Sequence, residues 1–294
     1  MEQLNECILA LDAGGSFLKS ALFFNGEIDT DSVDSEGANS NGDASVVHSA
    51  YSALLTRQRG RAEKKGARIK RVCVDTPGPF DYSGGICLMK HKYSAIYGVP
   101  LRPWMREVLG EDVEISFIHD SEAFILGAIR EVPNYKRIAG IMLGTGLGFA
   151  ICIDGEVLRN EIGGPRVSLF SRKYREGIAE DYISARGIVN AYNSANPKIP
   201  VTNSLEIERK ALEQNDQIAM ATYENMGRML GEVCGDVLKE YRIEALLIGG
   251  QISHAYSLFS NELIGALSDV ETLKVIKPIE NINTVHLLGV VQSK

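Results

Sequence analysis

The amino-acid sequence predicts an α/β protein built from two similar halves. With 294 residues, the chain is long for one hydrophobic core and suits two domains of about 100 to 200 residues each. Apolar, strand-like segments alternate along it with segments of helical periodicity. A pattern of glycine turns and hairpins also occurs twice. Strands alternating with helices, in two copies, favour two related domains with mixed sheets.

The repeat places residues 15–28 on residues 144–157 without a gap, at an offset of 129 positions. Each copy predicts a strand, a glycine turn with a small hydroxyl residue, a second strand and a hairpin turn. The two hairpin turns, Asn25-Gly26 and Asp154-Gly155, are typical of the type I′ geometry. One such hairpin would arise easily by chance. Two matching turns at one spacing make duplication the better explanation.

The other elements follow in chain order. Residues 35–43 are polar and predict a loop, and a helix over 44–65 opens after Asp43, a favourable N-cap. Residues 114–118 predict a strand and residues 121–130 a helix with apolar residues at helical spacing. A second polar loop covers 193–203, a long amphipathic helix covers 216–241, and the apolar run "ALLIGG" predicts a strand that ends in glycine.

Composition excludes several classes of function. The net charge of −7, with 38 acidic and 31 basic residues, disfavours nucleic acid as a partner. The five cysteines are scattered through apolar runs without a CxxC pair, which predicts reduced core thiols. No apolar run is long enough for a membrane span, and the first seven residues lack a signal-peptide pattern. We therefore expect a cytoplasmic protein without a membrane partner.

The first glycine turn predicts a phosphate site. Backbone N–H groups of Gly14, Gly15 and Ser16 would form a concave anion-binding turn, which needs no net positive charge. Lys19 lies nearby; as a single lysine on a hairpin it is more often a solvated charge. Asp12 cannot contact phosphate, but it suits a bound Mg²⁺, held through water.

The second half supplies corresponding turns. Gly144, Thr145, Gly146 and Gly148 would hold the remaining phosphates of a nucleotide clamped from both sides. The pair Gly249-Gly250 would let the backbone approach a base or sugar closely. Each turn alone is a weak signal, and the prediction depends on their combination.

Asp120 stands where a predicted strand meets a predicted helix, at the seam between the two repeats. Ligands of α/β proteins bind beyond the carboxyl ends of strands at such a switch point. An aspartate there is commonly an N-cap, and it could also accept the proton of an alcohol during phosphoryl transfer. Both roles are compatible.

These segments together resemble the ROK family, which comprises bacterial sugar kinases and sugar-responsive repressors of the actin and hexokinase superfamily. "LDAGGSFLKSALF" is similar to its first phosphate motif, with Ser16 where threonine is usual, and "LGTGLGFAICIDGEV" to its second. "TPGPFDYSGGI" resembles its sugar loop, "HDSEAF" its catalytic motif and "LLIGGQIS" its adenosine motif. "NTVHLLGVVQSK" resembles its closing helix. The likeness covers nearly the whole chain.

The resemblance implies a duplicated actin-like, ribonuclease H-like ATPase fold with a nucleotide cleft between two domains. The first would cover residues 1–118 plus a C-terminal helix at about 282–294, and the second residues 119–281. It implies ATP and Mg²⁺ as cofactors, Asp120 as catalytic base, a small-molecule sugar as substrate and, as is common in the family, a homodimer. The implied sugar-binding residues are Gly78, Asp81, His119, Asp120, Glu161 and Glu180.

The sequence departs from the family pattern after Glu161. Members usually carry a histidine at the position of Gly164, followed by a cysteine-rich zinc segment, and every one of those cysteines is absent here. We therefore expect no structural zinc. The missing imidazole removes a donor to the sugar, which commonly costs about 1–3 kcal/mol of binding or discrimination. His119, in place of the usual asparagine, could substitute for it or could be a half-buried histidine satisfied by the backbone.

A basic cluster occupies the former zinc loop. Its members could pair with acids such as Glu176 and Glu180 and hold the loop without metal, or they could meet an acidic sugar. We favour the structural role, because charges on loops are usually solvated. The cluster comprises Arg166, Arg172, Lys173 and Arg175.

Three functions remain open at this stage. The leading hypothesis is an ATP-dependent kinase that phosphorylates a hydroxyl of a hexose or N-acetylhexosamine. The departure at Gly164 motivates the second, a non-catalytic sugar or nucleotide sensor. The third is an ATPase that ignores sugar, although such relatives carry long extra domains for which 294 residues leave no room.

Overall fold

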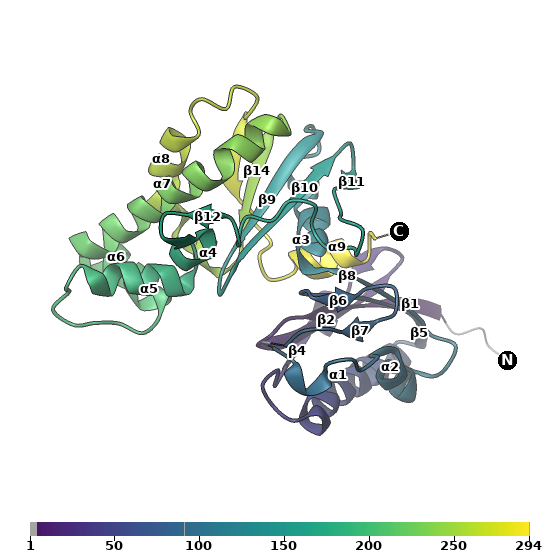
Figure 1. Cartoon of the computed structure of the whole chain (residues 1–294). Helices are drawn as coiled ribbons and strands as arrows, with labels where there is room; N and C mark the ends of the chain where they lie inside the picture. Colours follow the sequence, from purple (N-terminus) through teal and green to yellow (C-terminus); the bar gives the residue numbers. More distant parts are fainter. Residues whose placement is uncertain (1–4, 91, 294) are drawn as a thin grey trace. The chain divides into compact units, whose positions relative to one another are not determined.

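The computed structural model describes residues 5–90 and 92–293 and separates into two compact units (Figure 1). The first unit runs to Gly127 and also contains Arg159–Gly164 and the chain from Asn283 onward. The second contains Ala128–Leu158 and Pro165–Ile282. Each unit holds one main β-sheet, and the hydrophobic cores of the two units are separate.

The sheet of the first unit has the strand order β3-β2-β1-β5-β8, with β4 also paired to β2. Strands β1 and β2 are antiparallel, whereas β1, β5 and β8 run parallel to one another. The carboxyl ends of the three parallel strands therefore lie at one edge of this sheet. The strands are β1 (Asn5–Ala13), β2 (Phe17–Phe24), β3 (Glu27–Ile28), β4 (Asp34–Gly37), β5 (Ala67–Thr76) and β8 (Glu114–His119).

Alternate side chains of these strands enter two separate cores, because successive residues of a strand face opposite sides of the sheet. Leu9 and Leu11 pack in a core that includes residues of α1 (Ala44–Lys64) and α2 (Arg102–Leu109). Ala10 packs in a smaller core formed with α3 (Asp120–Ala128) and α9 (Val285–Val290). Both faces of the central strands are thus covered by helices.

Two glycines allow α9 to pack closely against α3. A Cβ added to Gly289 would lie 1.7 Å from the carbonyl oxygen of Ala123, and one added to Gly127 would lie 2.0 Å from that of Val285. Neither position therefore accepts a larger residue without a backbone shift. This close packing holds α9 in the same unit as β1.

The second unit has the sheet order β11-β10-β9-β14-β15. Helices α7 and α8 supply much of its core, together with α5 and α6. Asp216 caps α7 by accepting hydrogen bonds from the backbone of Ile218 and Ala219. The elements are β9 (Arg137–Leu143), β10 (Leu147–Ile153), β11 (Glu156–Val157), β14 (Ala245–Gly249), β15 (Val275–Pro278), α4 (Ala179–Tyr182), α5 (Ala185–Ser194), α6 (Ser204–Gln214), α7 (Gln217–Glu240) and α8 (Tyr256–Ala266).

The internal repeat predicted from the sequence is confirmed. Strands β1, β2 and β3 pair as β9, β10 and β11 do, and in each unit a parallel strand follows on the other side of the first strand. The two hairpin turns have nearly identical backbones, with φ of 53° and 83° at Asn25-Gly26 and 52° and 84° at Asp154-Gly155. Positive φ at both positions is the type I′ geometry that the residue types indicate.

Local differences from the expected elements occur at two places. Residues 35–43 are not wholly a loop, because Asp34–Gly37 forms β4 on the edge of β2. The helical turn near the C-terminus covers only Val285–Val290, which is shorter than the expected stretch of about 282–294. Asp43 occupies the N-cap position of α1 as expected, but its side chain makes no capping hydrogen bond.

Strand β4 is tied to α1 by ion pairs. The Oδ2 atom of Asp34 accepts hydrogen bonds from Arg57 Nε at 2.8 Å and from Arg61 Nη1 at 2.6 Å. A third contact joins Arg57 to Glu36 at 2.8 Å. Burial raises the pKa of Asp34, but the hydrogen bonds from the two guanidinium groups outweigh it and hold that pKa below its usual range.

The variant Asp34→Asn is expected to unfold more easily by about 1–2 kcal/mol at neutral pH, since two charge-assisted hydrogen bonds are weakened. A carboxylate with a lowered pKa stabilises the fold above the pKa of the unfolded chain, about 4, and this contribution disappears as pH falls through the lower folded-state value. Urea unfolding at pH 7 and near pH 3 should therefore show the gap between variant and wild type closing in acid. A gap of equal size at both pH values would contradict the electrostatic origin.

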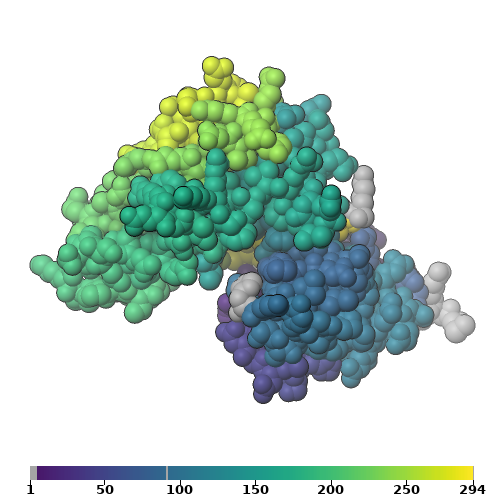
Figure 2. Space-filling view, in the orientation of Figure 1, coloured from purple at the N-terminus to yellow at the C-terminus, as the bar shows by residue number. Residues whose placement is uncertain are grey.

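Two expectations from composition concern the cysteines and the membrane-spanning segments. All five cysteines are free and buried, so the prediction that they lie in the core is confirmed. Among the described residues, no helix has the length and apolarity needed to cross a membrane. Part of the segment around residue 200, drawn green, lies on the visible surface of the second unit in Figure 2. Ile199, Leu205 and Leu212 are exposed apolar residues of this unit.

Candidate functional site

The first glycine turn joins β1 to β2 and is held from outside. The carbonyl oxygen of Gly14 accepts a hydrogen bond from Tyr93 Oη at 2.6 Å, and that of Gly15 accepts one from Ser40 Oγ at 2.5 Å. With its carbonyls used in this way, the turn is fixed in one conformation. A Cβ on Gly15 would lie 3.0 Å from Cδ of Lys92, so a lysine side chain covers this glycine.

Asp12, which is partly exposed, lies at the end of β1 beside the buried carboxylate of Asp75. In the register of the sheet, its neighbours are Lys19 on the antiparallel strand β2 and Asp75 on the parallel strand β5. His286 of α9 completes the group, with Nδ1 3.3 Å from Asp75 Oδ1. One ligand atom from each of Asp12, Asp75 and His286 lies within 4.8 Å of the others.

The charges of this group shift one another. Burial and the nearby charge of Asp12 raise the pKa of Asp75 to about 8. Burial also raises the pKa of Asp12, although His286 and Lys19 oppose the shift. For His286 burial favours the neutral ring, but the carboxylates outweigh it and raise its pKa to about 9. The cluster therefore attracts positive charge.

Asp120 lies where β8 meets α3, as the sequence predicts, with 30% of its side chain exposed. Its Oδ1 accepts a hydrogen bond from the backbone N–H of Ser121 at 2.7 Å and lies 2.8 Å from Nδ1 of His119. Burial raises the pKa of Asp120, but attraction to His119 and His286 and these hydrogen bonds outweigh it and lower that pKa. Asp120 is thus an ionised, accessible acceptor at neutral pH.

The ring of His119 is placed by three neighbours. Its Nδ1 lies 2.8 Å from both Asp120 Oδ1 and Ser121 Oγ, and a donor N–H at Nδ1 satisfies both oxygens. The backbone N–H of Ser121 is also 3.1 Å from Nδ1, but its shorter bond to Asp120 assigns it there. The opposite nitrogen, Nε2, faces Gly78, where an added Cβ would lie 3.6 Å away.

The predicted sugar loop forms the hairpin of β6 (Phe80–Asp81) and β7 (Ile86–Cys87). Asp81 uses its carboxylate within this hairpin, accepting from Gly84 N at 2.8 Å and from Ser83 Oγ at 2.9 Å. Tyr82 instead faces His119, with ring centroids 5.9 Å apart. Asp81 therefore stabilises the turn of this hairpin, and the ring of Tyr82 lies near His119, which contacts Asp120.

Residues Arg159–Gly164 belong to the same unit as Asp120. Asn160 organises the segment, since its Oδ1 accepts from the backbone of Ile162 at 3.1 Å and of Gly164 at 3.0 Å. A Cβ on Gly164 would lie 3.1 Å from Asn160 Nδ2, so the glycine and the asparagine fit each other. Glu161 is exposed at the tip.

Arg159 anchors this segment to α3. Its guanidinium forms an ion pair with Glu122, a buried residue two positions after the candidate base. Gly163 has φ of +84°, and a Cβ there would lie 3.0 Å from the ring of Tyr82. Glu161 is therefore carried by a loop that is fixed at both ends to residues around Asp120.

The second glycine turn, between β9 and β10, is in contact with the carboxylate of Glu180. The Oε2 atom of Glu180 accepts a hydrogen bond from Leu147 N at 3.0 Å, and a Cβ on Gly146 would lie 2.6 Å from the same oxygen. Thr145 is exposed, and a Cβ at Gly144 would meet no atom within 4 Å. An anionic oxygen thus fits this turn.

The remaining glycines predicted for the site, Gly148, Gly249 and Gly250, belong to strands β10 and β14 of the second unit or directly follow them. Gly148 lies on β10, and a Cβ there would meet the flexible side chain of Met142. Gly249 is buried at the end of β14, and Gly250 follows with φ of +82°. A Cβ on Gly250 would lie 2.2 Å from the carbonyl oxygen of Leu143, so this glycine allows a close approach between two parts of the protein backbone.

The basic cluster holds its loop, but not through the acids named from the sequence. Arg172 donates to the carbonyl of Val233 at 2.7 Å and pairs with Asp236 at 3.3 Å. Arg175 lies over the rings of Tyr174 and Tyr182, 5.1 and 5.7 Å from their centroids. A backbone contact, cation–π contacts and an ion pair with Asp236 therefore replace the expected pairs with Glu176 and Glu180.

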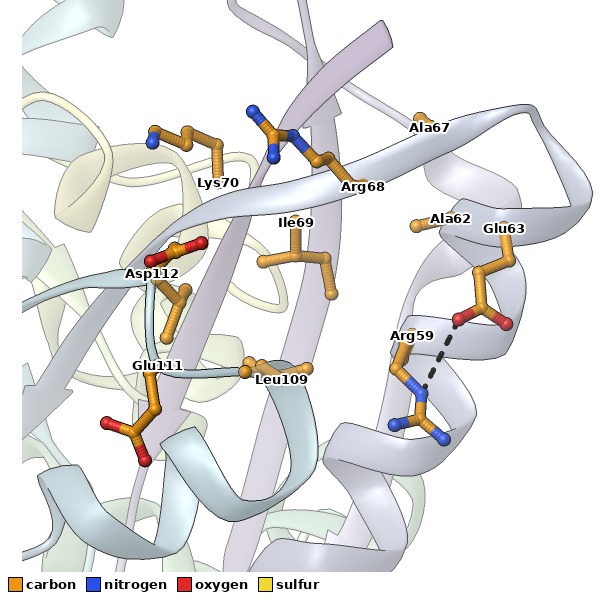
Figure 3. A pocket seen from close by; sticks show the side chains of 12 residues that line it. Arg59, Ala62, Glu63, Ala67, Arg68, Ile69, Lys70, Leu109, Glu111 and Asp112 are labelled. Carbon is orange, nitrogen blue, oxygen red and sulfur yellow. Dashed lines mark ion pairs between the residues drawn. The ribbon is translucent and has the colours of Figure 1, made fainter. Parts of the chain in front are cut away.

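A groove of about 230 Å³ in the first unit is lined by none of these residues. Figure 3 shows the side chains that line it. Its walls come from the end of α1, the start of β5 and the segment before β8, including Arg59, Ile69 and Leu109. Asp12, Asp75 and Asp120 lie instead at the carboxyl ends of β1, β5 and β8 or just beyond. Ligands of α/β sheets bind at the latter edge, so the groove is not the candidate site.

Three residues near the site were missed in the sequence. Asp75, like Asp12, is a carboxylate near the end of a buried apolar strand. The reasoning applied to Asp12 could therefore have identified Asp75 from the sequence. No local pattern marks His286, which meets Asp75 from 211 positions away. Lys92 also lacked a signal, because only the fold brings it to Gly15.

Comparison with known proteins confirms the resemblance and the fold class. A model of the ROK family matches residues 171–277. The N-acetylgalactosamine kinase AgaK of Shewanella sp. (strain ANA-3) is 25% identical over 236 residues, which cover 72% of this chain and 73% of that one. The sequence likeness thus extends well beyond the segment matched by the family model.

Solved structures share the fold over nearly the whole chain. A ROK family glucokinase from Streptomyces griseus, in complex with glucose and AMPPNP, has a TM-score of 0.75 at 17% identity, covering 97% of both chains. A ROK family transcriptional regulator, a homolog of the E. coli MLC protein, has a TM-score of 0.81 at 19% identity and covers 98% of this chain and 77% of its own. The chain has the duplicated actin-like ATPase fold.

Proposed function

We propose that this chain, a protein of ROK type with the actin-like ATPase fold, is an ATP-dependent kinase that phosphorylates a hydroxyl of a hexose or N-acetylhexosamine. The observation that carries the proposal is Asp120. It is an ionised carboxylate, 30% exposed, at the carboxyl end of a parallel strand and next to a cluster that attracts positive charge. The kinase activities named for the relatives support the same reaction class.

The residues present fit a nucleotide and a divalent cation. A carboxylate oxygen already accepts from the backbone of the second glycine turn, and phosphate oxygens would accept from such donors in the same way. Asp75 Oδ2 is buried without a hydrogen-bond partner among the described residues, beside Asp12. Asp12 would hold Mg²⁺ through its water shell, and the cation would neutralise charge on the transferred phosphoryl group.

Asp120 would act as the general base. A sugar hydroxyl placed against its free oxygen loses its proton to that carboxylate as the oxygen attacks the γ-phosphorus and the bond to ADP breaks. Ser121 N–H and the His119 ring hold the other oxygen, Oδ1, so the acceptor has one orientation. Glu161 and the Nε2 atom of His119 are our candidates for binding other sugar hydroxyls. The implied role of Glu180 in sugar binding requires it to leave Leu147 N.

A second function, sugar sensing without catalysis, is favoured by one observation: the regulator with a TM-score of 0.81 covers nearly the whole chain. In this alternative the chain would bind sugar in the same place and release no ADP. The packing of Gly164 against Asn160 fits either function. A glycine at this position lacks the imidazole that is usual in the family, but Asp120 is still present.

A panel of hexoses and N-acetylhexosamines, scored for ADP release in the presence of ATP and Mg²⁺, separates these functions. We expect one sugar, or a few, to raise ADP release at least about tenfold above the sugar-free rate, with a phosphorylated sugar as product. Saturable sugar binding in calorimetry without ADP would support the sensor. ADP release at one rate with every sugar would indicate a plain ATPase, and absence of any binding of ATP or ADP would overturn the proposal.

A further inference from the structure

We propose that Asp12, Asp75 and His286 form a direct binding site for one divalent cation, with a preference for Mn²⁺ over Mg²⁺ and no requirement for nucleotide. The role of this cation in phosphoryl transfer rests on the proposed function, whereas its binding does not. Direct ligation by three side chains differs from a Mg²⁺ held through water by Asp12 alone.

The fold brings the three donors together from distant parts of the first unit. Neighbouring parallel strands place Asp12 opposite Asp75, and α9 supplies His286. The donor atoms lie within 4.8 Å of one another, and His286 Nδ1 is 3.3 Å from Asp75 Oδ1. Donors at about 2.1 Å from one octahedral ion are about 3 Å apart in adjacent positions, which the 3.3 Å contact approaches, and about 4.2 Å apart in opposite positions, so a bound cation would draw the donors slightly closer together.

One atom of the group points independently to a missing ligand. Asp75 is fully buried, with 0% of its side chain exposed, and its Oδ2 has no hydrogen-bond partner among the described residues. Leaving a buried carboxylate oxygen unpaired is costly, and nearly all such atoms in native proteins are satisfied. A cation bound between Asp75 and Asp12 would satisfy this oxygen.

The sheet places charged groups around the proposed cation. Asp12 lies opposite both Lys19 and Asp75, and His286 Nδ1 lies 3.3 Å from Asp75 Oδ1. A divalent cation between the two carboxylates would replace a proton there, and it would bind His286 as the neutral ring, because a ligating imidazole must first release its proton. A proton shared between Asp12 and Asp75 is the competing arrangement, and it predicts no metal binding.

The position of His286 is rigid enough to serve as a ligand. Helix α9 is held against α3 by the close contacts of Gly289 with Ala123 and of Gly127 with Val285. The imidazole therefore reaches the carboxylates without a flexible loop. Ligand chemistry then sets the choice of metal: Mg²⁺ takes oxygen ligands and keeps several waters, whereas an imidazole nitrogen suits transition metals, and Mn²⁺ accepts both.

The test titrates Mn²⁺ into the full-length chain without nucleotide or sugar, with bound metal followed by electron paramagnetic resonance. We expect one Mn²⁺ per chain, with a pulsed spectrum showing coupling to an imidazole nitrogen, and weaker competition by Mg²⁺. His286→Gln should abolish the nitrogen coupling and weaken binding at least about tenfold, and Asp75→Asn should weaken it similarly. His48→Gln, a matched change at a histidine on α1 that pairs with Glu107, should bind as wild type does.

Three results would each overturn the site: no Mn²⁺ binding without nucleotide, bound Mn²⁺ without nitrogen coupling, or unchanged binding in His286→Gln. If that variant does not fold, His119→Gln decides the source of the nitrogen, because the coupling must persist when the other nearby imidazole is removed. Sugar phosphorylation with Mg²⁺ in a protein that fails these tests would overturn the site alone and leave the proposed kinase intact.

Discussion

Replacing Asp120 by asparagine is expected to lower kcat for sugar phosphorylation by about 10²–10⁴-fold, the usual contribution of a general base, while ATP binding stays nearly unchanged. Asparagine has the same shape as aspartate, and its amide oxygen can still accept the hydrogen bond from Ser121 N–H. The start of α3 should therefore keep its conformation. What the variant loses is an atom that accepts a proton.

The Asp120→Asn substitution should affect kcat and the sugar KM differently. The sugar KM should change little, because a neutral amide still offers hydrogen-bonding groups to a sugar hydroxyl, whereas kcat should fall. The lowered pKa of Asp120 keeps the wild-type carboxylate ionised throughout the neutral range, so titration of this group should not change wild-type kcat between pH 6 and about 9. Asparagine does not titrate, so raising the pH should not rescue the variant.

Coupled ADP release gives kcat, and calorimetry with a non-hydrolysable ATP analogue gives the affinity. Asp112→Asn is the matched control, since it removes an exposed carboxylate of the same unit before β8. It should keep wild-type activity. Activity within a few-fold of wild type in Asp120→Asn would remove this residue from the mechanism, and loss of nucleotide binding would show that the substitution had disturbed the fold.

Features that depend on a few neighbouring residues could be predicted from the sequence. The turns at Asn25-Gly26 and Asp154-Gly155 have the backbone that their residue types favour, because few residues tolerate two successive positive φ angles. Helices α1 and α7 begin and end within one residue of the predicted spans, since apolar periodicity and capping groups mark them. Asp120 was placed at a strand–helix junction by the same local signals.

Features that depend on distant partners could not be predicted. Strand β4 has the polar sequence DSEG, and it is a strand because β2 offers an edge and arginines of α1 pair with its carboxylates. The pair of Asp75 and His286 joins residues far apart in the chain. Contacts of Arg172 with α7 were equally hidden, because surface charges have many candidate partners in a sequence and the fold selects one.

The C-terminal helix links fold stability to this chemistry through Gly289. A methyl group there would occupy a position 1.7 Å from the carbonyl oxygen of Ala123, 2.6 Å from Gly127 N and 2.7 Å from the carbonyl carbon of Ala123. All three are backbone atoms of α3, so no side-chain rotation relieves the clash. Either α9 moves away from α3, or α3 is distorted close to Asp120.

Gly289→Ala is therefore expected to destabilise the protein by about 3 kcal/mol or more, at the upper end of overpacking effects. Gly60→Ala is the matched control: it also lies inside a helix, a Cβ there would meet no atom within 4 Å, and alanine should stabilise it by about 0.5–1 kcal/mol. Urea unfolding measures both changes. Hydrogen exchange should show faster opening of α9 in the first variant only, because its contacts with α3 are the ones broken. Equal stability of Gly289→Ala and wild type would mean that the close contact of α9 with α3 does not hold the helix, and would also remove the rigid support that delivers His286 to Asp75.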